Sequence, residues 1–154
     1  MQAAITPDHE RFMQGALELA DQAEAMGEVP VGAVVVVRGQ IVGGGSNAPI
    51  SMGDPTAHAE ILALREAAKQ LETYRLNGAT LYATMEPCAM CAGALVNARV
   101  DKLVFGTRDL RFGAVRSKFR LADSDLLNHQ VEIVEGVLAD ECLQRLQRFF
   151  AARR

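Results

Sequence analysis

The stretch A-T-L-Y-A-T-M-E-P-C-A-M-C-A-G-A (79–94) joins a strand pattern to a helix start. Residues 79–84 are mostly apolar or β-forming, which predicts a short strand. Pro87 suits the first turn of a helix, which we expect to continue to about Asn97. A strand followed by a helix is the unit that builds sheets with parallel strands. The stretch therefore predicts an α/β fold.

The rest of the chain supplies further strands and helices. V-G-A-V-V-V-V-R-G-Q-I-V-G-G-G (31–45) predicts two strands joined by a tight turn at residues 38–40. We expect further strands over 102–106 and 131–136, and helices from Pro7 to about Gly27, over 57–70 and over 140–152. This order predicts a three-layer α/β/α sandwich with a five-stranded, mostly parallel central sheet. The length predicts a single domain over 1–154.

Composition bears on class and location. Hydrophobic residues make up 49% and charged residues 23% of the chain, which is typical of a globular protein. No apolar run approaches the roughly 20 residues that a membrane span needs, and M-Q-A-A-I-T-P-D-H-E (1–10) does not resemble a secretory signal. Without a signal, and with only three cysteines, we expect a cytoplasmic protein whose close cysteine pair binds metal or does chemistry.

Charge is unevenly distributed along the chain. The net charge of −3 argues weakly against nucleic-acid binding, whose usual mark is an excess of Lys and Arg. Residues 99–120, however, hold seven basic side chains against two acidic ones, and the chain ends F-F-A-A-R-R (149–154). A solvated loop and a helix C-terminus would also explain this charge. Charge alone therefore leaves RNA binding as one of two interpretations.

Three residues have the types and spacing of metal ligands. His58, in H-A-E (58–60), and Cys88 and Cys91, in P-C-A-M-C (87–91), each lie near the start of a predicted helix. Both helices are expected at the C-terminal side of the sheet, where α/β folds place their sites. Three protein ligands leave the fourth position of a tetrahedral zinc ion open to water, as in catalytic sites. Glu60 could reach that water as a proton carrier.

A cysteine pair at this spacing has other common uses. In a redox pair we would expect C-x-x-C soon after the first strand of a thioredoxin-like unit, but here it follows the third strand. A structural zinc site would need a second ligand pair. His9 and His129 are isolated, and we expect Cys142, in the last helix, to be a core residue. The combination of H-A-E with P-C-x-x-C therefore favours catalytic zinc.

The same residues carry a resemblance to a known family. H-A-E followed by E-P-C-A-M-C is similar to the signature of the zinc-dependent cytidine and nucleobase deaminases. Nearly the whole chain resembles the bacterial tRNA-specific adenosine deaminases within that superfamily. The motifs that carry this resemblance include E-V-P-V-G-A-V (28–34), N-A-P-I (47–50), D-P-T-A-H-A-E-I (54–61), V-F-G-T-R-D (104–109) and N-H (128–129).

The resemblance implies a cytidine deaminase-like fold and hydrolytic deamination of adenosine to inosine at the wobble position of a tRNA anticodon. It implies one Zn²⁺ per subunit on His58, Cys88 and Cys91, with Glu60 as the proton shuttle. It places Asn47 in the pocket for the target nucleoside, and it assigns contacts with flanking anticodon nucleotides to Asp109 and Asn128. It also implies a homodimer, with the final helix meeting RNA.

Three other functions remain open. The first is a zinc-dependent deaminase of a free base or nucleoside, such as cytosine, cytidine or guanine. The basic segment disfavours it, because a free nucleoside has no phosphates to contact. The second is a zinc-stabilised RNA-binding module without catalysis, which the open ligand position and Glu60 disfavour. The third is a protein-interaction scaffold, which predicts purified protein without metal.

Overall fold

The computed structural model describes residues 4–153, which form five helices and five strands. In chain order these are α1 (Pro7–Ala25), β1 (Gly32–Val37), β2 (Gln40–Ser46), α2 (Pro49–Met52), α3 (Ala59–Leu71), β3 (Thr80–Met85), α4 (Ala89–Asn97), β4 (Lys102–Thr107), β5 (Glu132–Glu135) and α5 (Ala139–Ala151). Every strand and every long helix that the sequence predicts is present, with ends within a few residues of those expected.

The strands form one sheet in the order β2-β1-β3-β4-β5. β1 pairs antiparallel with both β2 and β3, whereas β3–β4 and β4–β5 are parallel pairs. Four strands therefore point the same way and β1 alone is reversed. The five-stranded sheet is confirmed. It is mostly parallel in strand direction, although its pairings divide equally between the two kinds.

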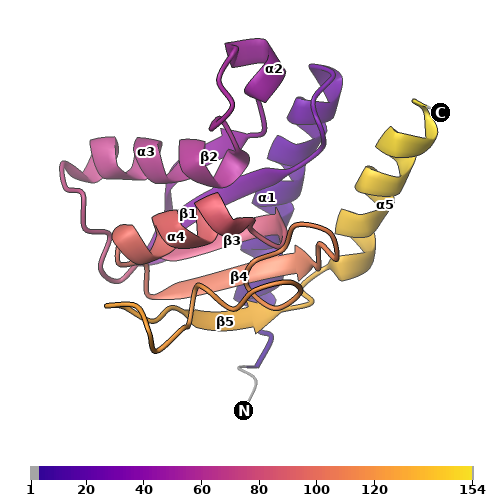
Figure 1. Cartoon of the computed structure of the whole chain (residues 1–154). Coiled ribbons are helices and arrows are strands. Elements are labelled where there is room, and N and C mark those ends of the chain that lie inside the picture. Colours follow the sequence, from indigo (N-terminus) through magenta and orange to yellow (C-terminus); the bar gives the residue numbers. More distant parts are fainter. Residues whose placement is uncertain (1–3, 154) are drawn as a thin grey trace.

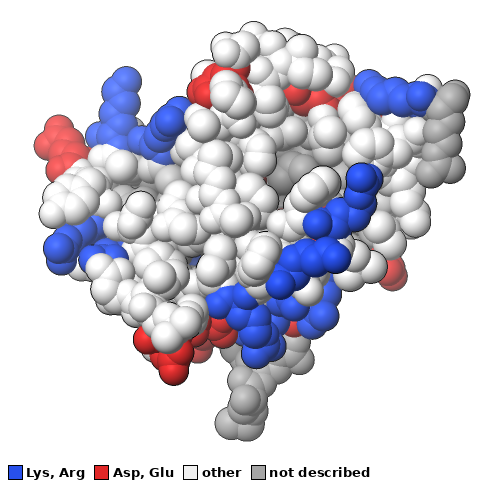
Figure 2. All heavy atoms as spheres, viewed as in Figure 1, with Lys and Arg blue, Asp and Glu red and all other residues white. Residues whose placement is uncertain are grey.

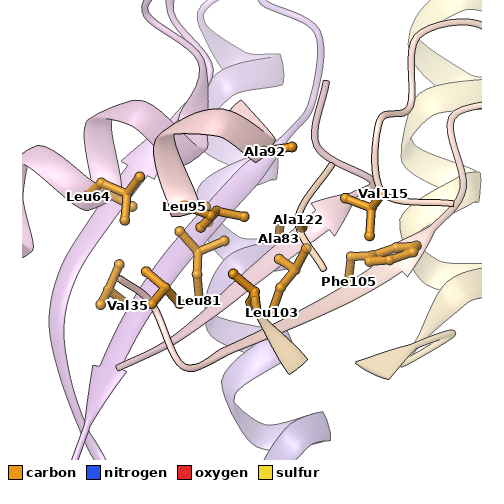
Figure 3. Close-up of a cluster of buried hydrophobic side chains, with 14 of the residues drawn as sticks. Val35, Leu64, Leu81, Ala83, Ala92, Leu95, Leu103, Phe105, Val115 and Ala122 are labelled. Carbon is orange, nitrogen blue, oxygen red and sulfur yellow. The ribbon is translucent and has the colours of Figure 1, made fainter. Parts of the chain in front are cut away.

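Helices cover both faces of the sheet, which confirms the three-layer sandwich (Figure 1). One apolar cluster lies between the sheet and α3 with α4, where Leu64 and Leu95 meet Leu81 and Leu103 (Figure 3). A second lies under α1 and α5 and includes Cys142, the expected core cysteine. Alternate residues of β1 enter opposite clusters, so its apolar run serves both faces.

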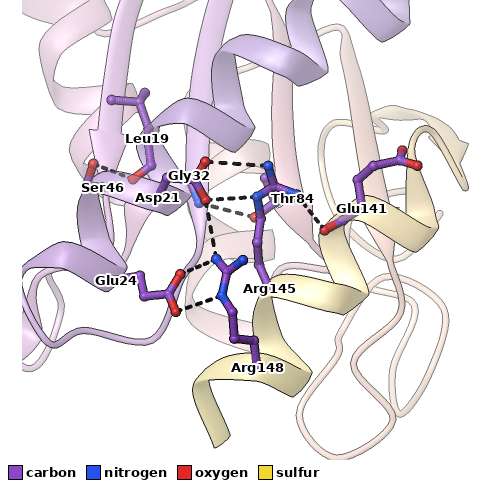
Figure 4. Close-up of polar contacts among 9 residues, drawn as sticks. All are labelled: Leu19, Asp21, Glu24, Gly32, Ser46, Thr84, Glu141, Arg145 and Arg148. Carbon is purple, nitrogen blue, oxygen red and sulfur yellow. Dashed lines mark hydrogen bonds and ion pairs between the residues drawn. The ribbon is translucent and has the colours of Figure 1, made fainter. Parts of the chain in front are cut away.

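Polar contacts join the first helix to the last. Arg145 and Arg148 of α5 bond to Asp21 and Glu24 of α1 (Figure 4). α5 also lies beside the segment that follows β4, because residues 108–111 and residues 143–151 line a common pocket. In that region Lys and Arg side chains form a row across the surface (Figure 2). Arg154, part of the basic chain end, lies outside the described residues.

Two connecting segments were left open or undefined by the sequence: the one before α3 and the one between β4 and β5. The turn-rich segment before α3 contains the short helix α2, which the sequence analysis missed. The buried carboxylate of Glu28 accepts hydrogen bonds from the backbone N–H groups of Ile50 and Ser51 and holds this helix. The segment between β4 and β5 has no helix. Among residues 4–153, no helix is long and apolar enough to cross a membrane.

A glycine in β2 lets α3 approach the sheet closely. A Cβ atom added at Gly45 would lie 2.3 Å from the carbonyl oxygen of Ala59, in the first turn of α3. A helix can pack this close only against a residue without a side chain. Gly45 therefore fixes the position of the α3 N-terminus, which carries H-A-E.

Candidate active site

The three expected ligands meet at the sheet edge where β2, β3 and β4 end. His58 is the N-cap residue of α3 and Cys88 that of α4, while Cys91 lies in the first turn of α4. Asp54 helps to set the entry to α3, because its Oδ1 accepts hydrogen bonds from the backbone N–H and hydroxyl of Thr56 at 2.8 and 2.7 Å. Two helix N-termini therefore deliver the ligands to one point.

The ligand atoms have the spacing of a metal site. Sγ of Cys88 and Sγ of Cys91 each lie 3.5 Å from Nδ1 of His58, and all three atoms lie within 4.8 Å of one another. Zinc binds sulfur at about 2.3 Å and nitrogen at about 2.0–2.1 Å, so tetrahedral geometry separates the two by about 3.6 Å. The three residues therefore fit zinc. In the described part of the chain, no other three His, Cys, Asp or Glu side chains bring their ligand atoms within 4.8 Å of one another.

Hydrogen bonds among the two thiols and the imidazole shift their pKa values. A hydrogen bond from Cys91 and another from His58 lower the pKa of Cys88 to about 4. Donation to Cys88, together with burial, raises the pKa of Cys91. The bond to Cys88 likewise raises the pKa of His58. A thiolate thus already forms at the helix N-terminus, and loading a metal ion would release the remaining protons.

Glu60 stands beside the ligands without joining their cluster. It is buried in the first turn of α3 and lines the same cavity as His58 and Cys88. Burial is the main cause that raises the pKa of Glu60 to about 6. A carboxyl group that titrates near neutrality can both accept and donate a proton, which suits a general acid–base role.

A cavity of about 320 Å³ opens onto these residues. Asn47 lines it, and its side-chain amide donates to the carbonyl of Val29 at 3.3 Å. This bond uses the amide nitrogen and fixes the orientation of the side chain, so the carbonyl oxygen, which has no donor among residues 4–153, is available to accept from a ligand. The other lining residues are Val29, Val31, His58, Glu60, Met85, Glu86, Cys88, Asp109, Arg111, Phe112 and Phe150.

The two residues assigned to flanking nucleotides lie in different places. Asp109 lines the cavity, and its side chain accepts from the backbone N–H groups of Arg111 and Phe112, each at 3.1 Å. Asn128 is exposed near the starts of β4 and β5, where it accepts from Arg99 at 3.4 Å. That is the opposite edge of the sheet. Within one chain, the structure does not bring Asn128 to the cavity, and its assigned contact stays a prediction.

Sequence reasoning assigned no role to Glu86 or Phe112, which line the cavity, and it singled out Phe150 only as part of the F-F-A-A-R-R ending. Glu86 immediately precedes the P-C-x-x-C motif, and Phe112 and Phe150 are 63% and 47% exposed at the cavity. Exposed aromatic rings offer surfaces on which bases stack. The sequence did contain a signal for Phe112, because an aromatic residue next to Arg111 in a basic segment is typical of RNA contacts. In the structure the Arg111 guanidinium lies 5.3 Å from the centre of the Phe112 ring.

The basic segment divides into paired and unpaired side chains. Arg108 makes a bidentate pair with Glu135, at 2.8 and 3.1 Å, and Arg116 makes one with Asp123, at 3.0 and 2.9 Å. The exposed side chains without a carboxylate partner among residues 4–153 are Arg111, Lys118 and Arg120. These three are the better candidates for phosphate contacts, because their charge is not already neutralised.

Comparisons with known proteins agree on the class. The model of the MafB19-like deaminase family matches residues 7–154. A tRNA-specific adenosine deaminase of Haemophilus influenzae is 53% identical over 94% of this chain and 84% of its own length. A solved structure from work on A-to-I editing by tRNA:A34 deaminases superposes with a TM-score of 0.85, at 39% identity over 88% of this chain and 99% of that one. A guanine deaminase of Nitrosomonas europaea superposes with a TM-score of 0.81, at 27% identity over 97% and 87%.

Proposed function

This chain belongs to the tRNA-specific adenosine deaminases, and from that premise we propose which residues perform the reaction. The reaction is hydrolytic deamination of adenosine to inosine at the wobble position of a tRNA. We assign zinc binding to His58, Cys88 and Cys91, and proton transfer to Glu60. The two 3.5 Å separations between sulfur and imidazole nitrogen are the observation that supports this most strongly.

The proposed roles follow from the chemistry of each group. Bound zinc would supply Lewis-acid activation of a water molecule near neutral pH. Glu60 accepts a proton from the attacking water and passes it to N1 of adenine. The water oxygen bonds to C6. Glu60 then takes the second proton from that oxygen and delivers it to the exocyclic amine, so that the bond between C6 and the exocyclic nitrogen breaks, a C6=O bond forms, and ammonia leaves. The raised pKa of Glu60 supports both transfers.

The cavity residues are proposed to hold the target nucleoside. Asn47 offers its carbonyl oxygen as an acceptor, and Phe112 and Phe150 offer apolar surfaces at the cavity. An adenosine in an anticodon loop is already in a single-stranded region, so moving it into a pocket costs only a few kcal/mol. We propose that Asp109 contacts a flanking nucleotide, since it lines the same cavity.

Assembly and location are also proposals. We propose a homodimer, as the resemblance described above implies, and work in the cytoplasm on tRNA, which the tRNA-specific relatives support. A single catalytic domain over the chain is supported by the family match over 7–154 and by one continuous five-stranded sheet.

Inosine formation tests the assignment directly. The purified protein is incubated with an anticodon stem-loop that carries a wobble adenosine, alone, with a chelator, and with zinc restored. We expect inosine in the first and third reactions only. His58→Ala should lose both metal content and turnover. Full activity of the chelated, metal-free protein would contradict the zinc assignment.

Free substrates test the second candidate function, deamination of a free base or nucleoside. The structural likeness to a guanine deaminase favours guanine as the compound to test. Adenosine, cytidine and guanine are assayed beside the stem-loop under the same conditions. We expect turnover of the stem-loop to exceed that of each free compound. Strong turnover confined to a free compound would favour the free-base reaction.

A further inference from the structure

A buried carboxylate outside the proposed chemistry organises one wall of the cavity. Glu86 follows β3 directly and is 3% exposed. Its two oxygens accept five hydrogen bonds, and every donor belongs to the segment 109–117. This concentration of donors on one side chain, from a segment without regular structure, indicates that the segment takes its shape from Glu86.

The five bonds divide unequally between the two oxygens. Oε1 accepts from the backbone N–H of Asp109 at 3.0 Å and from the hydroxyl of Ser117. Oε2 accepts from the backbone N–H groups of Val115, Arg116 and Ser117 at 3.0, 2.7 and 2.9 Å. Successive backbone N–H groups that converge on one point form an anion-binding concavity. Here the anion is the protein's own carboxylate.

The enclosed segment carries cavity residues and touches the metal ligands. Asp109, which Glu86 holds at one end of the segment, lines the cavity, and so do Arg111 and Phe112, which lie between the two ends. Gly113 packs directly on the carboxylate, since a Cβ atom there would lie 2.3 Å from Cδ of Glu86. Gly113 also forms a β-bridge with Cys88. Glu86 therefore links the metal-binding turn to the wall that faces the substrate.

We propose that Glu86 is a positioning residue for RNA binding, which acts through the 109–117 segment rather than on the reacting atoms. The inference rests on the proposed function, because it concerns how that site holds its polynucleotide substrate. Under this proposal, two glutamates at the same cavity have different roles. Glu60 sets the rate of the chemical step, and Glu86 sets the affinity for the anticodon loop.

The substitution Glu86→Gln separates positioning from general folding. The amide oxygen can replace Oε2 and keep the three bonds from residues 115–117. The amide nitrogen then replaces Oε1, where the Ser117 hydroxyl can accept from it but the Asp109 N–H faces another donor. Only the Asp109 end of the segment should be released. Loss of one hydrogen bond to a charged group predicts a rise of about tenfold in KM for the stem-loop.

Glu28→Gln is the matched control. Glu28 is also buried, at 2% exposed, and also holds backbone N–H groups, but these belong to α2 rather than to the 109–117 segment. Both variants are compared with wild type for zinc content, melting temperature, kcat, KM and amide hydrogen exchange. We expect both to melt lower and to keep zinc. Only Glu86→Gln should lose exchange protection at Asp109 and raise KM while kcat changes little.

The outcomes distinguish this inference from the function on which it rests. If wild type makes no inosine, the proposed function fails, while exchange at Asp109 still tests the anchoring. If wild type is active and Glu86→Gln keeps a wild-type KM, or loses zinc or kcat instead, the positioning role is overturned. Should Glu86→Gln not fold, Ser117→Ala removes one of the five bonds, and we expect a smaller rise in KM; no rise would overturn the role.

Discussion

Three buried glutamates, Glu28, Glu60 and Glu86, differ in what surrounds their carboxylates. Burial by itself raises the pKa of each group. Hydrogen bonds from Ser51 outweigh burial at Glu28, and bonds from Ser117 and neighbouring N–H groups outweigh it at Glu86, so both pKa values are lowered. At Glu60 burial dominates and the pKa rises to about 6. Of the three, only Glu60 is suited to exchange protons near neutral pH.

This difference predicts the effect of replacing Glu60. Glu60→Gln keeps the volume and removes the proton carrier, so we expect kcat to fall roughly 10²- to 10⁴-fold. Zinc content should stay at the wild-type level, because Glu60 is not in the ligand cluster. Metal analysis and single-turnover inosine formation measure the two effects.

Glu66→Gln is the control for that experiment. Glu66 lies on the same helix, α3, with an exposed side chain that bonds to the backbone N–H of Gly44. We expect it to retain wild-type turnover. A Glu60→Gln enzyme that deaminates as fast as this control would remove Glu60 from the mechanism.

The sequence predicted that His58, Cys88 and Cys91 come together because their information is local. H-A-E and P-C-x-x-C each place their residues at one helix start, and helix starts after strands share one edge of the sheet. Glu86 could not be assigned in this way. Its partners lie 23 to 31 residues downstream, in a segment with no periodic pattern. Asn128, by contrast, lies just before the predicted strand 131–136, and the start of a parallel strand lies at the edge opposite the site, so only the resemblance grouped it with Asp109.

At the scale of elements, strong periodicity predicted the long helices and the strands. The four-residue helix α2 was missed because its stability does not come from its own sequence pattern. Glu28, more than twenty residues earlier, supplies the hydrogen bonds that hold its first turn. The close contact of α3 with β2 was not predicted either, because G-G-G in a strand can mark a weak strand, a bulge or a close backbone approach, and it does not say which element approaches.

That contact predicts the effect of adding one methyl group. Gly45→Ala places a Cβ atom 2.3 Å from the Ala59 carbonyl oxygen, so α3 must move away from β2. We expect a loss of roughly 1–3 kcal/mol in the free energy of unfolding, as for other overpacked sites. Zinc affinity should fall as well, because His58 caps this helix. Denaturant unfolding and metal titration measure the two changes.

Gly15→Ala is the matched control, in the interior of α1. A Cβ atom there would lie 3.6 Å from Cδ1 of Ile41, which is ordinary van der Waals contact. Alanine in a helix interior is favoured over glycine by roughly 0.5–1 kcal/mol, so we expect a gain in stability and no change in zinc affinity. Equal effects of the two substitutions would show that the close approach of α3 does not matter.

At the scale of the whole molecule, the distribution of charge matters more than its sum. The chain has a net charge of −3, yet Lys and Arg side chains gather along the face between the segment after β4 and α5 (Figure 2). Carboxylates neutralise part of the basic segment 99–120, as with Arg108 and Arg116. Composition could predict the excess of basic residues in this segment, but not which of them are paired.

The unpaired residues predict how RNA affinity responds to salt. Each phosphate that a cation neutralises contributes about −0.7 to the slope of log affinity against log salt for a single strand. Lys118→Gln and Arg120→Gln should therefore each make the slope shallower by up to about 0.7. Arg38→Gln removes the same charge from the β1–β2 turn, at the opposite edge of the sheet, and should leave the slope unchanged. Stem-loop binding of the three variants and the wild type, measured across a salt series, distinguishes phosphate contacts at Lys118 and Arg120 from an effect of overall charge. Equal slopes for all three variants would mean that RNA senses only the overall charge, whereas a change confined to Lys118 and Arg120 would place phosphates on the face beside the cavity.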